Sequence, residues 1–344
     1  MLQSSEPKKL ATSPLKILVT GGAGYIGSHT VRQLLAAGHQ VTVVDNLYSG
    51  HRWAVPPKAD FHQLDAGDET AMSSLLRQQR TDAVIHFAGH IVVPESIAEP
   101  AKYYRNNVVG SLNLIRACCA SGVGCFIFSS SAAVYGDPEQ IPVAEHHPTI
   151  PINPYGRTKL ITEWTLRDMA LGGRQGNTGF KYVALRYFNV AGASLDGTLG
   201  QATPEATHLI KVACETATGQ RPSISMFGHD YDTPDGTCVR DYIHVEDLAA
   251  AHLCALDHLQ SGGESQVLNC GYGRGFSVRQ VLDTVEQVSS ERLSIVEAGR
   301  RAGDPANLVA DNRAIREVLN WTPQYDDLAI ICRTAYNWEC RQLQ

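Results

Sequence analysis

A cluster of glycines directly after the first apolar run is the feature that most limits how this chain can fold. Lys16–Thr20 is mainly apolar, and the run GGAGYIG at positions 21–27 follows it without a break. Gly21, Gly24 and Gly27 recur at every third position, which permits a tight turn from a strand into a helix and lets backbone N–H groups approach an anion. The pattern predicts the strand–turn–helix unit that binds the pyrophosphate of a dinucleotide.

An acidic residue at the end of the next strand adds a second signal. Val41–Asp45 reads as a buried strand, and its last residue follows Gly27 by 18 positions. A carboxylate there accepts hydrogen bonds from the adenosine ribose hydroxyls and disfavours a 2′-phosphate. The glycines alone would also suit an ordinary tight turn, and Asp45 alone a solvated strand end. Strand, turn, helix and acid together predict NAD as the cofactor.

Short apolar runs continue to alternate with amphipathic stretches along the first half of the chain. The runs predict strands, and apolar residues at helical spacing predict helices between them. This order predicts an α/β fold, a Rossmann-type doubly wound parallel sheet with helices on both faces. The expected strands are Lys16–Thr20, Val41–Asp45, Asp60–Leu64, Ala83–Phe87, Cys125–Ser129 and Lys181–Tyr187, and the expected helices are Tyr25–Ala37, Thr70–Gln79, Asn107–Ser121 and Tyr155–Met169.

Beyond Asn189 the alternation weakens, which predicts a smaller C-terminal α/β lobe for the substrate. Leu171–Gly179 is rich in glycine and is expected to form a flexible surface loop. Further helices are expected over His208–Thr218, Val245–Leu259 and Ser277–Ser289. The expected organisation is a disordered tail at 1–15, an NAD-binding Rossmann domain at 16–188 with return crossings from the C-terminal part, and a mainly substrate-binding lobe at 189–344.

The composition favours a small-molecule partner. The formal net charge is −6, and the basic residues form no patch that would attract nucleic acid, so no nucleic-acid partner is expected. Nine cysteines show neither a disulfide framework nor zinc-ligand spacing, so we expect reduced, mostly buried thiols and no metal site. No apolar run approaches the roughly 20 residues of a membrane span, and the N-terminal residues lack a signal pattern, so we expect no membrane contact and a cytoplasmic protein.

A serine-rich strand end and a helix start carry the candidate chemistry. Ser131 ends the run SSS after the fifth expected strand, and Tyr155 and Lys159 lie four residues apart on one face of the next long helix. Tyrosine is a poor base at neutral pH, but a neighbouring ammonium lowers its pKa. Ser131 would then orient a substrate hydroxyl toward Tyr155. The Tyr-x-x-x-Lys spacing also occurs at ordinary exposed helix starts, and the glycine turn upstream favours the catalytic interpretation.

These segments together resemble the extended short-chain dehydrogenase/reductase family, and within it the UDP-glucose 4-epimerases. The resemblance covers nearly the whole chain from Lys16 and is carried by GGAGYIGSHT, VDNLYSG, HFAG, SSSAAVYG, PYGRTK, LRYFNVAGA, FGHDYDTPDGTCVRDYIHVEDLA and RRAGDP. It implies a reversible, NAD-dependent 4-epimerisation of UDP-glucose and UDP-galactose. In that family a tyrosine removes the sugar 4-hydroxyl proton while the C4 hydride passes to NAD, and the hydride returns to the opposite face of a 4-keto intermediate.

The resemblance also implies roles for individual residues. Tyr155 would be the base and later the acid, Lys159 its electrostatic partner and a nicotinamide-ribose contact, and Ser131 the residue that positions the hydroxyl. The implied cofactor contacts, besides Tyr155 and Lys159, are Gly21, Gly24, Tyr25, Ile26, Gly27, Asp45, Asn46, Asp65, Ala66, Phe87, Ala88, Gly89, Asn106, Ser129 and Phe188. The implied UDP-sugar contacts, besides Ser131 and Tyr155, are Asn189, His208, Leu209, Phe227, Arg240, Arg301, Asp304 and Leu308.

Guanidinium groups suit a diphosphate because they donate bidentate hydrogen bonds, and Asp304 would face the uridine ribose. Arg240 and Arg301 would equally suit a solvated surface if the motifs around them were ignored. A homodimer is also implied, through the helices expected at 107–121 and 155–169.

Three positions depart from the family pattern. Many of these enzymes carry a lysine after the FAG motif, whereas this chain has the run HIVVP from His90, which leaves His90 either as a substitute donor or as a packed loop residue. His208 stands where asparagine is frequent. Leu308 stands where tyrosine restricts and small residues permit N-acetylated sugars, and leucine leaves that selectivity undecided.

Other functions share much of this pattern. Dehydratases of the family carry an Asp-Glu pair beside the strand end, and here Ala132 and Ala133 follow Ser131, so the acid–base groups for elimination are missing. An epimerase of another UDP-sugar, either a UDP-N-acetylhexosamine or the pair UDP-xylose and UDP-arabinose, remains an alternative. A non-catalytic NAD-sensing protein is a further one, because a fold alone never establishes a function.

Overall fold

The computed structural model describes residues 14–176, 179–301 and 304–343. A seven-stranded, entirely parallel sheet forms its larger lobe. The strand order reverses between β1 and β4, the kind of switch point where open α/β sheets bind ligands at the carboxyl ends of their strands. In spatial order the strands are β10 (Gln266–Cys270), β6 (Lys181–Tyr187), β5 (Cys125–Ser131), β4 (Ala83–His86), β1 (Lys16–Thr20), β2 (Gln40–Val44) and β3 (Asp60–His62).

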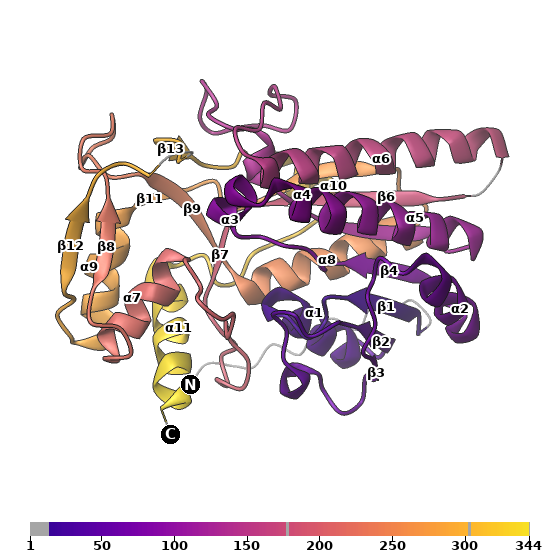
Figure 1. Ribbon diagram of the computed structural model, residues 1–344, viewed down its shortest axis with the longest axis horizontal. Helices are drawn as coiled ribbons and strands as arrows, with labels where there is room; N and C mark the ends of the chain where they lie inside the picture. Colours follow the sequence, from indigo (N-terminus) through magenta and orange to yellow (C-terminus); the bar gives the residue numbers. More distant parts are fainter. Residues whose placement is uncertain (1–13, 177–178, 302–303, 344) are drawn as a thin grey trace.

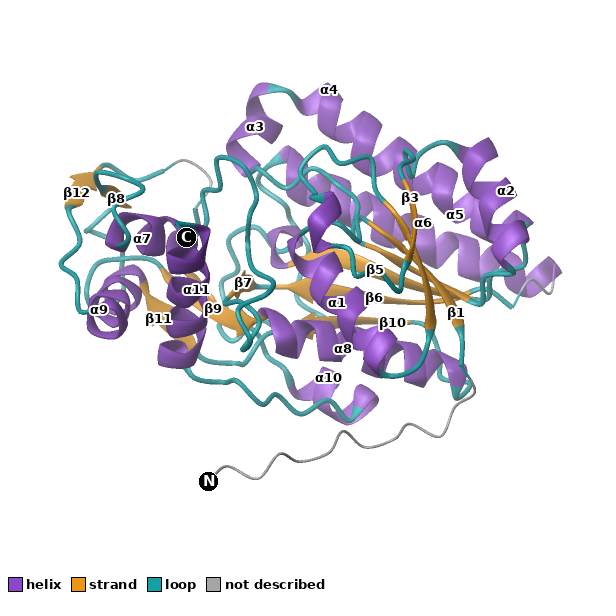
Figure 2. Cartoon of the chain, turned by 90° about the horizontal axis from the view of Figure 1, so that it is seen from below, coloured by secondary structure: helices purple, strands orange, loops and turns teal. Residues whose placement is uncertain are grey.

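Helices cover both faces of this sheet (Figures 1 and 2). One face carries α1 (Tyr25–Ala36), α8 (Val245–Gln260) and α10 (Arg313–Leu319), and the other carries α2 (Glu69–Gln79), α5 (Ser111–Ala120) and α6 (Pro154–Gly176). The strands between them are almost wholly buried, as a sheet covered on both faces requires. The predicted Rossmann-type doubly wound fold is confirmed.

Two short helices precede α5 at the edge of the second layer. They are α3 (Val93–Ala98) and α4 (Pro100–Tyr103), and wider π-helical turns over Tyr104–Gly110 join α4 to α5. The helix expected from Asn107 therefore begins earlier than its sequence pattern indicates, because Pro100 starts the first helical turn. Short 3₁₀ turns occur at Arg52–Ala54 and Ala132–Val134.

The smaller lobe lies beside the carboxyl ends of the strands (Figure 1). Its strands are β7 (Asn189–Ala191), β9 (Val239–His244), β11 (Gly275–Ser277) and β13 (Asn307–Leu308), with β8 (Ile224–Phe227) and β12 (Ile295–Ala298) as a separate pair. Its helices are α7 (Leu209–Ala217), α9 (Val278–Ser289) and α11 (Leu328–Gln342). One buried apolar cluster continues from the sheet, beneath α1 and α8, into this lobe, so the two lobes share a core.

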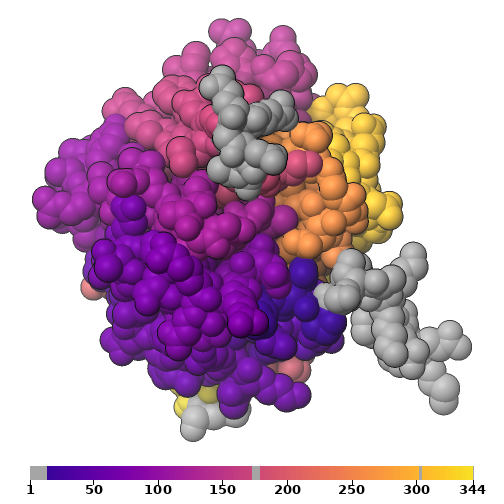
Figure 3. All heavy atoms as spheres, turned by 90° about the vertical axis from the view of Figure 1, so that its right-hand side faces the viewer, coloured from indigo at the N-terminus to yellow at the C-terminus, as the bar shows by residue number. Residues whose placement is uncertain are grey.

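The chain crosses between the lobes more than once. After β7 and β9 in the smaller lobe it returns as α8 and β10 to the larger one, where β10 pairs with β6. In the space-filling view, orange C-terminal segments lie beside the indigo and magenta N-terminal ones (Figure 3). No helix in the described part of the chain is long and apolar enough to cross a bilayer.

The loop expected at Leu171–Gly179 is wrong for most of its length. Helix α6 continues through Leu171 to Gly176, and residues 177 and 178 lie outside the described residues. Met169 and Ala170 pack against a buried apolar cluster, which supports helical backbone despite the glycines that follow. The tail expected at 1–15 also lies outside the described residues, apart from its last two.

Candidate active site

A cavity of about 640 Å³ lies where the smaller lobe meets the carboxyl ends of the strands. It brings together most of the candidate residues from both halves of the sequence. Lys159, Leu209 and Phe227 do not line it directly. The candidates that do are Gly21, Gly24, Tyr25, Ile26, Gly27, Asp45, Asn46, Asp65, Ala66, Phe87, Ala88, Gly89, Asn106, Ser129, Ser131, Tyr155, Phe188, Asn189, His208, Arg240, Arg301, Asp304 and Leu308.

The glycine turn leaves no room for larger side chains. Gly21 has a φ of +69°, and a Cβ atom there would lie 2.6 Å from the backbone nitrogen of Ala88. A Cβ atom on Gly27 would lie 2.2 Å from the carbonyl oxygen of Gly21. Backbone and ligand can therefore approach each other at the N-terminus of α1, where the helix dipole favours a phosphate.

Asp45 is buried at the end of β2, only 7 % exposed. Its carboxylate accepts hydrogen bonds from the backbone N–H of Ala23 (3.0 Å) and of Leu47 (2.8 Å), which fix its orientation at the cavity wall. A fixed carboxylate at this position suits the two hydroxyls of an adenosine ribose. The glycine cradle and Asp45 together fit an NAD molecule.

Helix α6 places the candidate catalytic pair at the junction of the two halves of the cavity. The Lys159 ammonium is buried, donates a hydrogen bond to the Ser129 carbonyl oxygen (2.7 Å) and lies 5.8 Å from the centroid of the Tyr155 ring. The Ser131 hydroxyl accepts a hydrogen bond from the backbone N–H of Ala133 (3.2 Å). The helical spacing of Tyr155 and Lys159 thus brings an ammonium beside a phenol, as expected.

The electrostatics of this pair differ from the expectation in one respect. Burial raises the pKa of Tyr155, and the opposing effect comes from a hydrogen bond with Ser131 and not from Lys159. Burial also lowers the pKa of Lys159 to about 8, against the attraction of the Glu163 carboxylate. The physical reason is position: the ammonium lies beside the ring and its hydrogen bond goes to Ser129, not to the phenol oxygen.

Two arginines lie at the opposite end of the cavity. Arg301 donates hydrogen bonds to both carboxylate oxygens of Asp304 (2.9 and 3.2 Å), and its guanidinium lies 5.5 Å from the centroid of the Phe227 ring. Arg240 donates to the carbonyl oxygen of Val239 (2.8 Å). Phe227 therefore belongs to this end through Arg301, although its own side chain does not line the cavity.

The uncertain positions also lie at or near the cavity. His208 shares a hydrogen bond of 2.8 Å with Gln201, and burial followed by the charge of Arg301 lowers the pKa of His208. Leu209 lines a small neighbouring cavity, and Leu308 lines the main one. His90 lines the main cavity and also packs edge-on against Tyr48, 4.8 Å between ring centroids.

Several lining residues were not predicted as contacts. Tyr48, Tyr187 and Gln201 line the cavity, although Tyr48 lies within VDNLYSG and Tyr187 within LRYFNVAGA. The Tyr187 hydroxyl shares a hydrogen bond with the buried His252 on α8. That contact joins residues 65 positions apart, and only the folded chain reveals it. Tyr48 shares its motif with the expected contact Asn46, and Gln201 lies close in sequence to the expected contact His208, and these signals could have found them.

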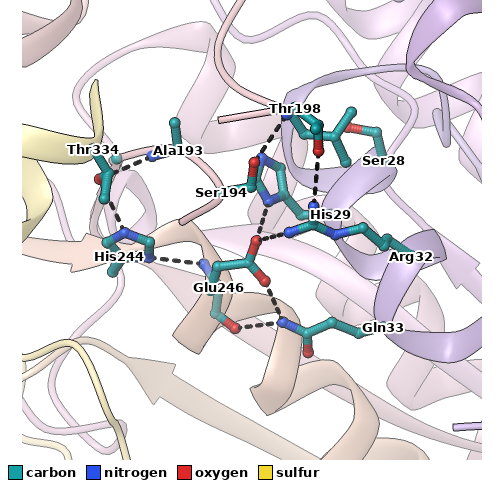
Figure 4. A network of polar contacts seen from close by, with 12 residues as sticks. Ser28, His29, Arg32, Gln33, Ala193, Ser194, Thr198, His244, Glu246 and Thr334 are labelled. Atoms are coloured by element: carbon teal, nitrogen blue, oxygen red, sulfur yellow. Dashed lines mark hydrogen bonds and ion pairs between the residues drawn. The ribbon is translucent and has the colours of Figure 1, made fainter. Parts of the chain in front are cut away.

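A buried polar network joins the two lobes behind the glycine turn (Figure 4). Glu246, in the first turn of α8, accepts hydrogen bonds from His29 (2.8 Å) and Gln33 (2.7 Å) of α1 and forms an ion pair with Arg32. On the other side, His244 shares a hydrogen bond of 3.1 Å with Thr334 of α11. The network ties the helix of the dinucleotide turn to the smaller lobe.

Comparison with known proteins identifies the class of this fold and site. The sequence matches the NAD dependent epimerase/dehydratase family over residues 17–271. The chain belongs to this family, which confirms that the protein is an NAD-dependent enzyme of the epimerase type. The cofactor predicted from the glycine turn and Asp45 is likewise confirmed as NAD.

Relatives that cover nearly the whole chain are 4-epimerases of UDP-sugars, and several of them are named UDP-glucose 4-epimerase. The UDP-glucose 4-epimerase of Azospirillum brasilense is 54 % identical over 329 residues, which are 96 % of this chain and 93 % of that protein. The crystal structure of UDP-glucose 4-epimerase from Brucella ovis in complex with NAD is 45 % identical, with a TM-score of 0.90 over 94 % of this chain and 97 % of that one. The UDP-Glc/GlcNAc 4-epimerase of Campylobacter jejuni is 49 % identical, with a TM-score of 0.82 over 95 % and 99 % of the two chains.

Proposed function

We propose that the protein interconverts UDP-glucose and UDP-galactose by inverting C4 of the hexose. The observation that carries this proposal is the meeting of Ser131, Tyr155 and the Lys159 ammonium between the dinucleotide turn and the two arginines. The near-full-length similarity to enzymes named UDP-glucose 4-epimerase supports the same reaction.

The arginine end of the cavity would hold the UDP moiety. Arg240 and Arg301 would donate bidentate hydrogen bonds to the diphosphate, because a guanidinium presents parallel N–H groups that match phosphate oxygens. Asp304 already orients Arg301 through two hydrogen bonds and would face the uridine ribose. The hexose would then extend from the diphosphate toward Tyr155.

At the hexose, Tyr155 as phenolate would take the proton of the 4-hydroxyl, which Ser131 orients by hydrogen bonding. Lys159 would stabilise the phenolate by its charge. NAD, when bound, accepts the C4 hydride and returns it. The C4–H and O–H bonds break as the 4-keto sugar forms, and after the sugar turns over, the hydride adds to its opposite face while Tyr155 gives the proton back.

The test is turnover of UDP-galactose by the purified protein without added NAD, with products separated by chromatography. We expect UDP-glucose with no net NADH, because the cofactor is regenerated in each cycle. Tyr155→Phe should retain NAD but lose about 10²–10⁴-fold in rate, the range for removing a general acid–base residue. Full turnover by Tyr155→Phe would refute the role of this tyrosine, and no turnover by the parent protein even with added NAD would favour an NAD sensor.

The range of sugars calls for a panel of substrates. The similarity to the Campylobacter jejuni UDP-Glc/GlcNAc 4-epimerase favours tests with N-acetylated sugars, and Leu308 lines the cavity where such a group would extend. UDP-N-acetylgalactosamine and UDP-arabinose therefore accompany UDP-galactose in the same assay. Turnover of only one of these other sugars would reassign the substrate and leave the C4 chemistry in place.

We also propose a homodimer formed through α5 and α6, located in the cytoplasm. Trp164 on α6 is 47 % exposed, and Val109, in the π-helical turns before α5, is 50 % exposed. Large apolar side chains exposed on neighbouring helices favour contact with a second subunit. All nine cysteines are unpaired, which is typical of proteins in a reducing compartment.

A further inference from the structure

Three side chains connect two separate segments at the rim of the cofactor half of the cavity. Tyr48 lies on the loop after β2, Glu95 on α3 and Lys102 on α4. The Lys102 ammonium donates one hydrogen bond to the Tyr48 hydroxyl (3.0 Å) and another to the Glu95 carboxylate. Tyr103 donates to the second carboxylate oxygen of Glu95 (2.8 Å), so the carboxylate is held in place.

The two segments form adjoining walls of the same cavity. The loop after β2 contributes Tyr48 to one wall, and the segment before α3 contributes His90 to the other. The Tyr48 ring packs edge-on against the His90 ring. Asn107 accepts a hydrogen bond from the backbone N–H of His90 (2.9 Å) and so fixes the position of this second wall. The bond between Tyr48 and Lys102 therefore joins the walls to each other.

The described residues that line the cofactor half of the cavity supply no lysine or arginine, and Lys102 lies just behind them. Among the described residues that line the cavity from Gly21 to Gly110, none is lysine or arginine, while Asp45 and Asp65 are acidic. The pyrophosphate of NAD carries two negative charges. Lys102 reaches this lining through the Tyr48 hydroxyl, and its own charge is paired with the Glu95 carboxylate.

We propose that Tyr48, Lys102 and Glu95 form a clasp that retains NAD in the cleft. The clasp joins the adenosine-side loop to the α3–α4 segment, and it opens when the Tyr48–Lys102 hydrogen bond breaks. Glu95 holds the ammonium in position toward Tyr48. This inference rests on the cavity being the NAD site, and it extends the proposed function by assigning cofactor retention to residues outside the glycine turn.

The test measures release of NAD from the purified holoenzyme. Protein loaded with radiolabelled NAD is mixed with excess unlabelled NAD, and the label that stays bound is followed over time without any sugar. Tyr48→Phe removes the hydroxyl and keeps the ring, and Lys102→Met removes the charge and keeps most of the aliphatic stem. Tyr48 is exposed and the Lys102 side chain is half-buried, and Lys58→Met, at an exposed position before β3, is the matched control.

We expect both clasp variants to release NAD about tenfold faster than the parent protein, as the loss of one charge-assisted hydrogen bond predicts. Lys58→Met should release it at the parent rate. The double variant Tyr48→Phe/Lys102→Met should release no faster than Lys102→Met alone, because both changes break the same bond. Added salt should accelerate release from the parent protein more than from Lys102→Met.

Equal release rates in the parent protein and both clasp variants would overturn the clasp. Additive effects in the double variant would also overturn it, since the two residues would then act independently. Because no sugar is present, failure of the proposed sugar reaction would not change these rates. The two proposals can therefore fail separately.

Discussion

Lys159 is buried, and burial disfavours its positive charge. The proposed chemistry needs that charge. Burial lowers the pKa of its ammonium, and burial raises the pKa of the neighbouring Tyr155. Both shifts disfavour the state in which a phenolate and an ammonium coexist. The hydrogen bond with Ser131 lowers the pKa of Tyr155 against burial, and the proposed chemistry adds the positive charge of Lys159 to that support.

The variant Lys159→Met tests whether the charge of Lys159 stabilises the phenolate of Tyr155. Lys159→Met should raise the pKa of Tyr155 further, because the phenolate loses its cationic neighbour while burial still disfavours its charge. The phenolate would then form only at higher pH, so the rising limb of the pH–rate profile should move upward by at least one pH unit. Rates of UDP-galactose turnover from pH 6 to 10 would show this, with Lys58→Met as control. An unshifted profile would mean that Lys159 does not act on Tyr155.

Replacing glycine by alanine should have opposite effects on stability at two positions. Gly27→Ala would place a Cβ atom 2.2 Å from the Gly21 carbonyl oxygen, so we expect a loss of about 1–3 kcal/mol in stability and of bound NAD. Gly172→Ala lies on α6 with nothing within 4 Å of the added atom and should stabilise by about 0.5–1 kcal/mol. Urea unfolding and the NAD content of the purified variants would check both. Normal NAD content in Gly27→Ala would contradict the tight turn.

At this scale, local motifs were enough to predict much of the site. Gly21, Asp45 and Tyr155 each lie in a short pattern whose spacing reflects one turn or one helix, and all of them line the cavity. Tyr48 and Tyr187 were missed because their contacts reach Lys102 and His252, 54 and 65 positions away. Contacts of that kind depend on which elements pack together. Short sequence motifs carry no information about that packing.

At the scale of the elements, the carboxylate of Glu246 on α8 holds α1 and α8 together. Burial raises the pKa of Glu246, but the hydrogen bond from His29 and the Arg32 charge outweigh burial and hold the pKa at about 2. An unfolded glutamate titrates near 4.3. Because the folded pKa is the lower one, Glu246 contributes stability above about pH 4.3 and loses it as the pH falls toward 2.

Glu246→Gln should therefore lower the free energy of unfolding at pH 7 by about 2–4 kcal/mol. Its stability should also fall less steeply between pH 5 and pH 3 than that of the parent protein. Glu317→Gln, at an exposed position of α10, is the matched control. Urea unfolding at several pH values would measure both effects, and parallel pH curves for parent and Glu246→Gln would argue against this role.

The helices and strands themselves were predictable to different degrees. Lys16–Thr20 and Lys181–Tyr187 have the predicted bounds, because long buried strands show apolar runs with clear ends. The loop predicted from the glycines after Leu171 was wrong, because packing of the preceding turn outweighs their low helix propensity. The two-residue β13 and the exposed β12 were not predicted, since such short strands carry no clear period.

For the molecule as a whole, Trp164 provides the test of subunit association. Trp164→Glu should shift the protein from dimer to monomer, because a charge would be buried at the proposed contact. Light scattering across a range of concentrations would report the mass. Leu195→Glu, which changes an exposed side chain of the smaller lobe, should leave the mass unchanged. A dimer that persists in Trp164→Glu, or a parent protein of monomer mass, would contradict the proposed interface.

The position of β10 in the sheet has a consequence for how the protein is made. On the ribosome β6 emerges with one edge unpaired, and its partner Gln266–Cys270 is synthesised only after β7, α7, β8 and β9 of the smaller lobe. Until then an apolar edge strand remains open to pairing with other chains. The larger lobe therefore cannot be completed as an independent unit during translation, and a fragment that stops after β7 would carry that open edge permanently.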